Sequence, residues 1–223
     1  MLKARNIITI FLFVLFAGIS GVFANTSSTE LTNDRISSTD IVFGNKDAKL
    51  LFIEYFSPTC AHCSDYHLNI FPELKRKYID TGKIAYVIRE LVGNKQDLDA
   101  SILARCKGDV DSQLKITSNL LRNQDSWAYS RDYKENLYNI AKEHGITGEQ
   151  YDLCLKDESK SQIQIDHTKF VVKDKDFLGT PSFYINGELY QGEYTTTGIS
   201  DFIDTLLTAA ENNNQNKEEK FNE

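Results

Sequence analysis

The residues of this chain best suited to chemistry are two cysteines separated by two residues, Cys60 and Cys63. They directly follow an apolar run, residues 50–56, and begin a stretch of helical character. At the first turn of a helix, unpaired backbone N–H groups and the helix dipole stabilise a thiolate. A disulfide formed there is therefore a relatively good oxidant. The spacing also fits half of a zinc site or an inert structural disulfide, but a strand before and a helix after favour redox chemistry.

Each position of this motif predicts a different role. Cys60, at the helix start, is expected to attack and be attacked, because a low thiol pKa makes it a good leaving group. Cys63 lies one turn further on and is expected to be more buried and to resolve mixed disulfides. His62 is expected to point to the surface beside Cys60 and to stabilise its thiolate when protonated; the alternative is a plain solvated histidine. An inert bridge is disfavoured because it would close too little chain to stabilise the fold.

Glu54 is a carboxylate within the otherwise apolar run 50–56. If it points under the cysteines, burial would raise its pKa, and it could pass protons to and from Cys63. The alternative is that it faces the strand end and water. Because Cys60, Cys63 and His67 fall on about one helical face, a zinc or copper site is a further alternative. No fourth ligand is evident, so we predict neither a metal nor another cofactor.

Two further cysteines, Cys106 and Cys154, lie on apolar helix faces. They could be buried free thiols that behave as small hydrophobic residues. The even cysteine count and the export signal described next favour a second, structural disulfide, which the loop-entropy estimate makes stabilising by about 4 kcal/mol. The remaining histidines, His144 and His167, are expected to be ordinary surface or half-buried residues.

Composition and the N-terminus limit the function classes. The chain has 223 residues and a formal net charge of −7, which argues against nucleic acid as the main partner. Residues 1–24 indicate a signal peptide, with basic Lys3 and Arg5, an apolar stretch at 7–17 and small residues up to Ala24. The alternative is an uncleaved membrane anchor. Either one places the rest of the chain outside the cytoplasm, where disulfides persist.

The elements that must position the cysteines follow from the hydrophobic pattern. The run 50–56 predicts a central strand covered on both faces. A helix is predicted over 60–79, and Pro72 should kink or divide it. Residues 84–92 are predicted as the next strand, parallel to the first because a helix joins the two. Residues 25–40, rich in Ser, Thr, Asn and Asp, indicate a linker before these elements.

The rest of the chain divides into a helical block and a return to strands. Residues 97–178 have helical spacing and predict a helical subdomain. Strand character returns at Ser182, and the dipeptide Asn186-Gly187 predicts a tight hairpin. A final amphipathic helix is predicted at 199–210. The polar, charged tail at 211–223 is expected to be disordered.

In this order of elements the chain resembles the thioredoxin superfamily, and its helical block is similar to that of the DsbA-like branch, the exported thiol–disulfide oxidoreductases of bacteria. Three anchors carry the match: residues 56–63 (Phe-Ser-Pro-Thr-Cys-Ala-His-Cys), Glu54 six residues before Cys60, and residues 179–183 (Gly-Thr-Pro-Ser-Phe). The Ala-His dipeptide differs from the Pro-His of the best-known members. This difference bears on the redox potential and not on the class of chemistry.

The resemblance covers residues 41–210 and implies a fold. It is an α/β fold, a thioredoxin fold with an inserted helical subdomain. Residues 41–96 and 179–210 would form the thioredoxin-fold domain, and residues 97–178 would form the insertion. Some DsbA-like proteins carry a second disulfide in that insertion, which agrees with a bridge between the remaining two cysteines.

The resemblance also implies a substrate site and a reaction. Pro181 would follow a cis peptide bond, and Thr180–Pro181 would lie against the Cys60 sulfur and pair with an extended substrate strand; the alternative is a trans surface turn. The implied reaction is donation of the Cys60–Cys63 disulfide to unfolded exported proteins in the periplasm, by a monomer reoxidised by a DsbB-type membrane partner. Alternatives are an isomerase or reductase, since Thr180 also occurs in isomerases, and a copper or zinc carrier.

Overall fold

The computed structural model describes residues 31–221, and side chains over residues 31–212. The predicted signal peptide, residues 1–24, and the first part of the predicted linker lie outside the described residues. Within 31–221, no helix combines the length and the apolar character needed to cross a bilayer.

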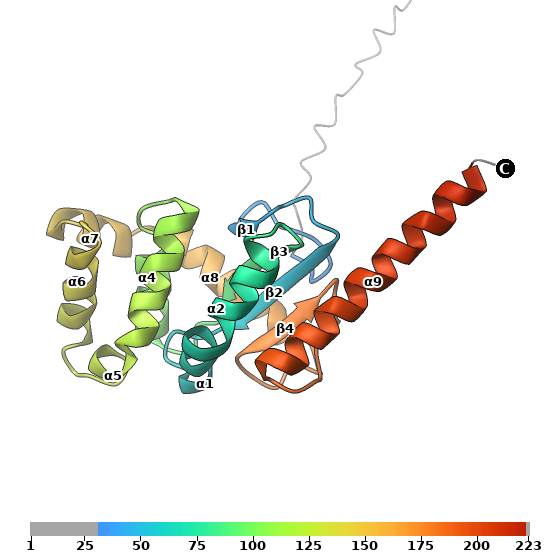
Figure 1. The fold of residues 1–223 in the computed structure, drawn as a ribbon. Helices are drawn as coiled ribbons and strands as arrows, with labels where there is room; N and C mark the ends of the chain where they lie inside the picture. Colours follow the sequence, from blue (N-terminus) through green and yellow to red (C-terminus); the bar gives the residue numbers. More distant parts are fainter. Residues whose placement is uncertain (1–30, 222–223) are drawn as a thin grey trace, which may run out of the picture.

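Five strands form one mixed sheet in the order β1-β3-β2-β4-β5 (Figure 1). In it, β2 pairs in parallel with β3, and the other neighbours are antiparallel. The strands are β1 Val42–Gly44, β2 Leu50–Phe56, β3 Ile84–Glu90, β4 Ser182–Ile185 and β5 Glu188–Leu189. Every residue of β2 and β3 is buried. The predicted central strand and its parallel partner are therefore confirmed.

The hairpin between β4 and β5 turns at Asn186 and Gly187, as predicted. Their φ angles are 49° and 92°, the left-handed pair that a tight two-residue turn requires. Asn186 also fastens the turn to the neighbouring strand, because its side chain accepts a hydrogen bond from Leu51 N at 2.8 Å and its own N–H donates to Leu51 O at 2.9 Å.

The helical connection from β2 to β3 is divided near Pro72, as predicted, but by π-helical turns. Its segments are α1 Ala61–Asp65, η1 Tyr66–Ile70, α2 Phe71–Leu74 and η2 Lys75–Ile79. Pro72 lies in the first turn of α2 and cannot donate a backbone hydrogen bond. Just before it, the N–H of Phe71 reaches back five residues to Tyr66 O, which is the wider π spacing. Both Tyr66 and His67 are consequently buried.

Alternate residues of the sheet serve two separate cores, as side-chain alternation along strands requires. One face packs against the α1–η2 run and the last helix, through Phe52, Phe56, Tyr86, Phe183, Tyr66, Phe71, Leu74, Ile199 and Ile203. The opposite face packs against Val171 of helix α8 (Glu158–Val171), through Leu51, Ile53, Tyr55, Val87 and Tyr184. The sheet is thus the middle layer of the fold.

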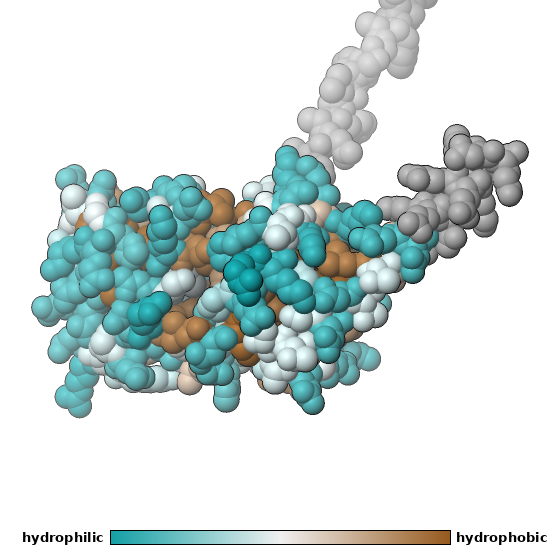
Figure 2. All heavy atoms as spheres, viewed as in Figure 1, coloured by the Kyte–Doolittle hydropathy of each residue, from teal (hydrophilic) through white to brown (hydrophobic). Residues whose placement is uncertain are grey.

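The insertion between β3 and β4 is helical, as predicted, and has its own core. Its helices are α3 Lys95–Ala104, α4 Val110–Arg122, α5 Gln124–Trp127, α6 Tyr133–Glu143, α7 Gly148–Leu155 and α8 Glu158–Val171. Trp127 is fully buried in that core and donates its indole N–H to Leu120 O at 2.9 Å. Figure 1 shows α4, α6 and α7 to one side of the sheet. Their outer surface is mainly hydrophilic, and apolar residues are visible between this block and the rest (Figure 2).

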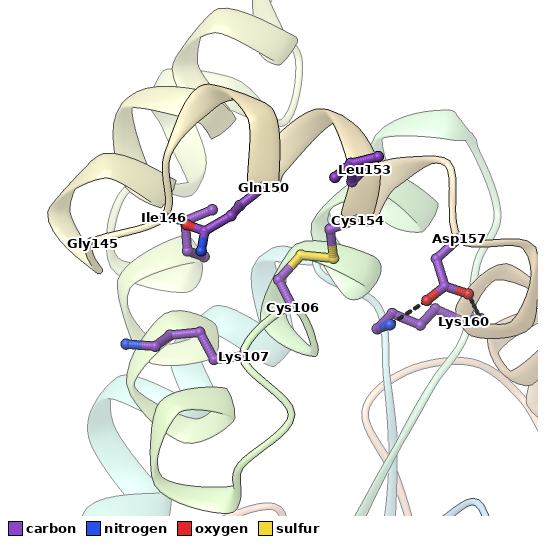
Figure 3. A pocket seen from close by; sticks show the side chains of 9 residues that line it. All are labelled: Cys106, Lys107, Gly145, Ile146, Gln150, Leu153, Cys154, Asp157 and Lys160. Atoms are coloured by element: carbon purple, nitrogen blue, oxygen red, sulfur yellow. Dashed lines mark hydrogen bonds and ion pairs between the residues drawn. A yellow bond between two sulfur atoms is a disulfide. The ribbon is translucent and has the colours of Figure 1, made fainter.

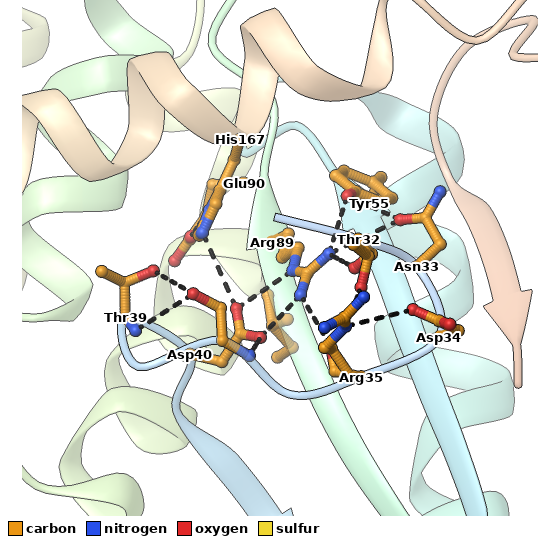
Figure 4. Close-up of polar contacts among 12 residues, drawn as sticks. Thr32, Asn33, Asp34, Arg35, Thr39, Asp40, Tyr55, Arg89, Glu90 and His167 are labelled. Atoms are coloured by element: carbon orange, nitrogen blue, oxygen red, sulfur yellow. Dashed lines mark hydrogen bonds and ion pairs between the residues drawn. The ribbon is translucent and has the colours of Figure 1, made fainter. Parts of the chain in front are cut away.

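Residues 31–40, which we call the N-terminal strap, are not the linker that their composition predicts. Arg89 on β3 is 0% exposed, and a buried guanidinium requires partners. The strap supplies them: Arg89 donates to Thr32 O at 2.6 Å, to Arg35 O at 3.3 Å and to the Asp40 carboxylate at 2.7 and 3.0 Å (Figure 4). The strap therefore supplies the hydrogen-bond acceptors of a buried cation.

The same buried ionic cluster continues into the insertion. Glu90 on β3 pairs with Arg105 at 2.8 Å. Burial alone would raise the pKa of Glu90, but Arg105, together with His167, overcomes this and lowers that pKa to about 2. The ring nitrogens of His167 on α8 lie 3.7 Å from an oxygen of Asp40 and 3.8 Å from an oxygen of Glu90. His167 is fully buried, so its prediction as a surface or half-buried residue is wrong, because α8 packs against the sheet. His144 is half-buried, as predicted.

The last helix, α9 Thr196–Phe221, is longer than the predicted 199–210. Its backbone remains helical through 211–221, so the prediction of a disordered tail is wrong for these residues. That stretch contains neither Gly nor Pro, the residues that most disfavour a helix interior. Figure 1 shows α9 extending past the sheet.

Candidate active site

Cys60 lies at the junction between β2 and α1, where it is the N-cap residue with an extended backbone. Its side chain is half-buried, and its Sγ lies 3.2 Å from the carbonyl oxygen of Thr180. Cys63, in the first turn of α1, is 0% exposed. Both cysteines are free thiols, so the structure corresponds to the reduced form of the pair.

The two sulfurs have opposite pKa shifts. A hydrogen bond with Cys63 is the main cause that lowers the pKa of Cys60 to about 5, against burial, which raises it. A hydrogen bond from the Thr180 side chain and the backbone N–H groups of Cys63 and His62 lower this pKa further. The pKa of Cys63 is raised far above its usual value, first by burial and then by Cys60. At neutral pH the reduced pair is therefore a Cys60 thiolate beside a Cys63 thiol.

The loop that carries Cys60 is held by Asp97 of α3, a residue that the sequence analysis did not single out. Asp97 is 2% exposed and accepts hydrogen bonds from Ser57 Oγ at 2.8 Å and from Thr59 Oγ1 and N at 2.8 and 2.9 Å. Its second oxygen accepts from Gly93 N at 3.1 Å. The Asn94-x-x-Asp97 spacing signals a helix start, and Asn94 does accept from Asp97 N at 2.7 Å. That signal says nothing of the contact with the loop.

Two more residues of the insertion contact the same loop. Gln124 donates from Nε2 to Pro58 O at 2.7 Å and to Cys60 O at 3.0 Å. Tyr129 donates its hydroxyl to Thr59 O at 2.9 Å, although 78% of the residue is exposed. The helical insertion is therefore part of the site, and only the folded chain reveals these contacts.

Glu54 points beneath the cysteines and not to water, so the exposed alternative is wrong. It is 0% exposed; its carboxylate accepts from Tyr86 OH at 2.6 Å and lies 2.9 and 3.0 Å from Nε2 of His67. Its negative charge also contributes to the raised pKa of Cys63, after burial and Cys60. Proton transfer between Glu54 and Cys63 remains a prediction.

Of the two histidines of this region, His67 is buried and His62 is exposed, as expected for His62. His67 is turned toward Glu54 by the π-helical segment, which contradicts the metal set of Cys60, Cys63 and His67. Among the described side chains, no three His, Cys, Asp or Glu gather in a way that could hold a metal ion. The His62 side chain is exposed, and it is the His62 backbone N–H that lowers the pKa of Cys60.

The Thr180–Pro181 peptide bond is cis, as predicted, and forms one wall of a pocket beside Cys60. We call it the Tyr194 pocket. It has a volume of about 330 Å³, and its other lining residues are His62, Asp65, Tyr66, Ile70 and Tyr194.

Cys106 and Cys154 form a disulfide with a Cα–Cα distance of 5.7 Å (Figure 3). The bridge joins the turn after α3 to the last turn of α7. Both cysteines line a surface pocket of about 480 Å³, together with Lys107 and the Asp157–Lys160 ion pair. The bridge ties together two helices that pack against the rest of the insertion's core.

Comparisons with known proteins agree with this geometry. A family model described as thioredoxin matches residues 36–205. A relative from Rickettsia bellii (strain RML369-C), whose name assigns it to the protein-disulfide oxidoreductases, is 49% identical over 178 residues, 80% of this chain and 68% of the relative. A relative from Rickettsia conorii (strain ATCC VR-613 / Malish 7) is 50% identical over 173 residues, 78% of this chain but 62% of the relative. The match thus spans about two thirds of these relatives' lengths.

Among solved structures, the crystal structure of Wolbachia pipientis alpha-DsbA1 is similar to this chain. The TM-score is 0.75 at 26% identity, covering 81% of this chain and 98% of that one. The shared architecture includes both the sheet and the helical insertion. The chain therefore belongs to the thioredoxin family, as a DsbA-like protein of the thiol–disulfide oxidoreductase class.

Proposed function

We propose that this chain is a thiol oxidase that donates its Cys60–Cys63 disulfide to pairs of thiols in other proteins. The observation that carries the proposal is the lowered pKa of Cys60, about 5, beside a buried Cys63 with a raised pKa. Stabilising the Cys60 thiolate stabilises the reduced protein and makes Cys60 a good leaving group. Both effects favour transfer of the disulfide to a substrate.

The proposed reaction has two exchange steps. A substrate thiolate attacks Cys60 Sγ, a new S–S bond forms, and the Cys60–Cys63 bond breaks with the electron pair on Cys63. Cys63 then takes a proton, which we propose Glu54 passes to it. A second substrate thiolate attacks the substrate sulfur of the mixed disulfide, and Cys60 leaves as the thiolate. Two electrons have passed from the substrate dithiol to the protein.

The proposed substrates are unfolded exported proteins with free thiols, held by the backbone of Thr180 as an added strand. We propose that the protein acts in the periplasm. The composition of residues 1–24 supports this, and so does the Cys106–Cys154 bridge, since such bonds persist in oxidising compartments. We further propose a monomer that a quinone-linked membrane partner of the DsbB type reoxidises.

Oxidation and isomerisation can be separated by comparing reduced and scrambled ribonuclease as substrates. The protein should accelerate recovery of reduced ribonuclease in a glutathione buffer, and Cys60→Ser should abolish this acceleration. Cys63→Ser should accumulate mixed disulfides with the substrate, because it lacks the resolving thiol. Rapid repair of scrambled ribonuclease without oxidation of the reduced form would instead indicate an isomerase. Stoichiometric copper or zinc in the purified reduced protein would point to a carrier.

A further inference from the structure

The Tyr194 pocket lies directly beside the reacting sulfur. Its wall includes Thr180, whose carbonyl oxygen is 3.2 Å from Cys60 Sγ. Along an extended peptide, alternate side chains point to the same side and are spaced by about 7 Å. A peptide whose cysteine is bonded to Cys60 would therefore bring the side chain two positions away into reach of this pocket.

The floor of the pocket is aromatic and held in place from below. The Tyr66 and Tyr194 rings lie 4.7 and 5.0 Å from the ring of Phe183, which is 0% exposed. Tyr66 is further fixed by a contact of 3.1 Å between its hydroxyl and that of Tyr86. The floor is thus preformed, and it suits a long side chain whose methylene groups can lie on aromatic faces.

The rim carries one carboxylate, that of Asp65 at the end of α1. Asp65 is exposed and accepts one hydrogen bond, from Asn69 Nδ2 at 2.7 Å, which leaves capacity for further donors because a carboxylate has about four acceptor sites. Of the described residues that line this pocket, Asp65 is the one carboxylate and His62 the one basic side chain, and none is Lys or Arg. A cationic head group would therefore be attracted at the rim, and an anionic one repelled.

We propose that the Tyr194 pocket takes a basic side chain, Lys or Arg, from the substrate segment that flanks the reacting cysteine, and that Asp65 determines this preference. The methylene stem lies on Tyr66, Ile70 and Tyr194, and the cation lies at the Asp65 carboxylate and over the tyrosine rings. This inference rests on the proposed oxidase function and specifies its substrate class.

The test uses the oxidised full chain and short peptides with one cysteine. Lys, Gln or Glu is placed two positions before or two positions after that cysteine, and the rate constant of mixed-disulfide formation is measured by acid quenching and mass spectrometry. At one of the two positions, Lys should react about threefold faster than Gln, and Glu about threefold slower, as expected for partly exposed ion pairs. Added salt should reduce both differences.

Three variants assign the effect. Asp65→Asn should bring the Lys and Glu peptides to equal rates, and Asp65→Lys should reverse their order. Glu73→Lys is the matched control, because it makes the same change of net charge at an exposed position of α2; it should keep the wild-type order. Circular dichroism checks that each variant is folded, and Asp65→Asn keeps the test decisive if Asp65→Lys does not fold.

The possible failures are distinguishable. Equal rates for the Lys, Gln and Glu peptides in the wild-type protein would overturn the inference and leave the oxidase proposal intact. So would a preference that survives in Asp65→Asn, or one that Glu73→Lys removes. Failure of every peptide to form a mixed disulfide would overturn the proposed function, and this inference with it.

Discussion

Cys60 and Cys63 differ in how readily their thiols ionise, although they are neighbours on one turn of helix. Cys60 is half-buried, at an N-cap position where backbone N–H groups converge, whereas Cys63 is fully buried beneath it. A negative charge is therefore stabilised on one sulfur and disfavoured on the other. The direction of attack in the exchange reaction follows from this difference.

The first prediction concerns the ionisation of Cys60. Its thiolate absorbance in the reduced protein should rise with a midpoint at about pH 5. Since the folded pKa lies below the unfolded one, ionised Cys60 stabilises the reduced fold; this contribution is complete above the unfolded pKa and is lost as the pH falls through about 5. Urea unfolding of the reduced protein over this range measures the loss, with Cys60→Ser as control. A midpoint near the ordinary cysteine value would contradict the assignment.

Asp97 gives a second prediction at this scale. Asp97→Asn removes the negative charge that strengthens three loop hydrogen bonds to one oxygen, and it replaces the second oxygen, which accepts from Gly93 N, with an NH₂ group that cannot accept. The variant should lose about 2 kcal/mol of stability, the size expected for hydrogen bonds to a buried charged group, and its peptide oxidation should slow. Asp125→Asn, at an exposed position of α5, makes the same charge change and should do neither. Equal unfolding midpoints for the two variants would show that Asp97 does not hold the loop.

Local sequence therefore predicts part of the site and misses the rest for a physical reason. Cys60 and Cys63 follow from a short motif, whereas the cis bond before Pro181 and the inward position of Glu54 were expected mainly through the family resemblance. Asp97 has ordinary neighbours in the sequence, and it becomes a site residue only because α3 packs against the loop before Cys60.

At the scale of elements, helix ends distinguish the two cysteine pairs. Cys60 lies at the start of α1, whereas Cys106 follows the C-cap residue Arg105 of α3, and Cys154 lies in the last turn of α7. The end of a helix carries partial negative charge, which disfavours a thiolate. The Cys106–Cys154 bridge should consequently be the poorer oxidant and the more resistant to reduction.

The third prediction follows from this contrast. When the oxidised protein is exposed to increasing dithiothreitol, Cys60 and Cys63 should become alkylated first, and Cys106 and Cys154 only at higher reductant. Differential alkylation with peptide mapping gives the order. A Cys60→Ser, Cys63→Ser double variant is the control, because in it the second bridge should reduce at the same concentration as in the wild type. Simultaneous reduction of both bridges would refute the helix-end argument.

Elements also show where pattern reasoning fails. Strands β2 and β3 are continuous apolar runs and were predictable, as was the Asn186-Gly187 turn. The π-helical turns around Pro72 were not, because the residue pattern indicates a break but not the hydrogen-bond spacing that accommodates it. The extension of α9 to Phe221 was missed because polar composition was taken as disorder.

At the scale of the whole molecule, the N-terminal strap joins the sheet to the insertion. Arg89 and Asp40 form an ion pair of 2.7 Å between side chains that are both 0% exposed, and His167 approaches Asp40 from α8. The strap was predicted as a linker because its sequence is polar. Its role becomes clear only from the fold, which places the buried Arg89 of β3 beside it.

The fourth prediction tests this junction. Asp40→Ala leaves Arg89 buried without its carboxylate and should destabilise the protein by about 3–5 kcal/mol, as for other broken buried pairs. Asp34→Ala, which removes the partner of Arg35 in an exposed pair of 3.6 Å, should change stability little. Urea unfolding of both variants gives the comparison. Similar midpoints would mean that the strap contributes little to the fold.

The measurement that tests the central claim most directly is the equilibrium reduction potential of the Cys60–Cys63 couple in glutathione buffers. The stabilised Cys60 thiolate and the buried Cys63 predict an oxidising potential of about −120 mV, the value of a strongly oxidising DsbA. A potential of about −270 mV, the value of thioredoxin, would contradict the oxidase proposal and indicate a reductase.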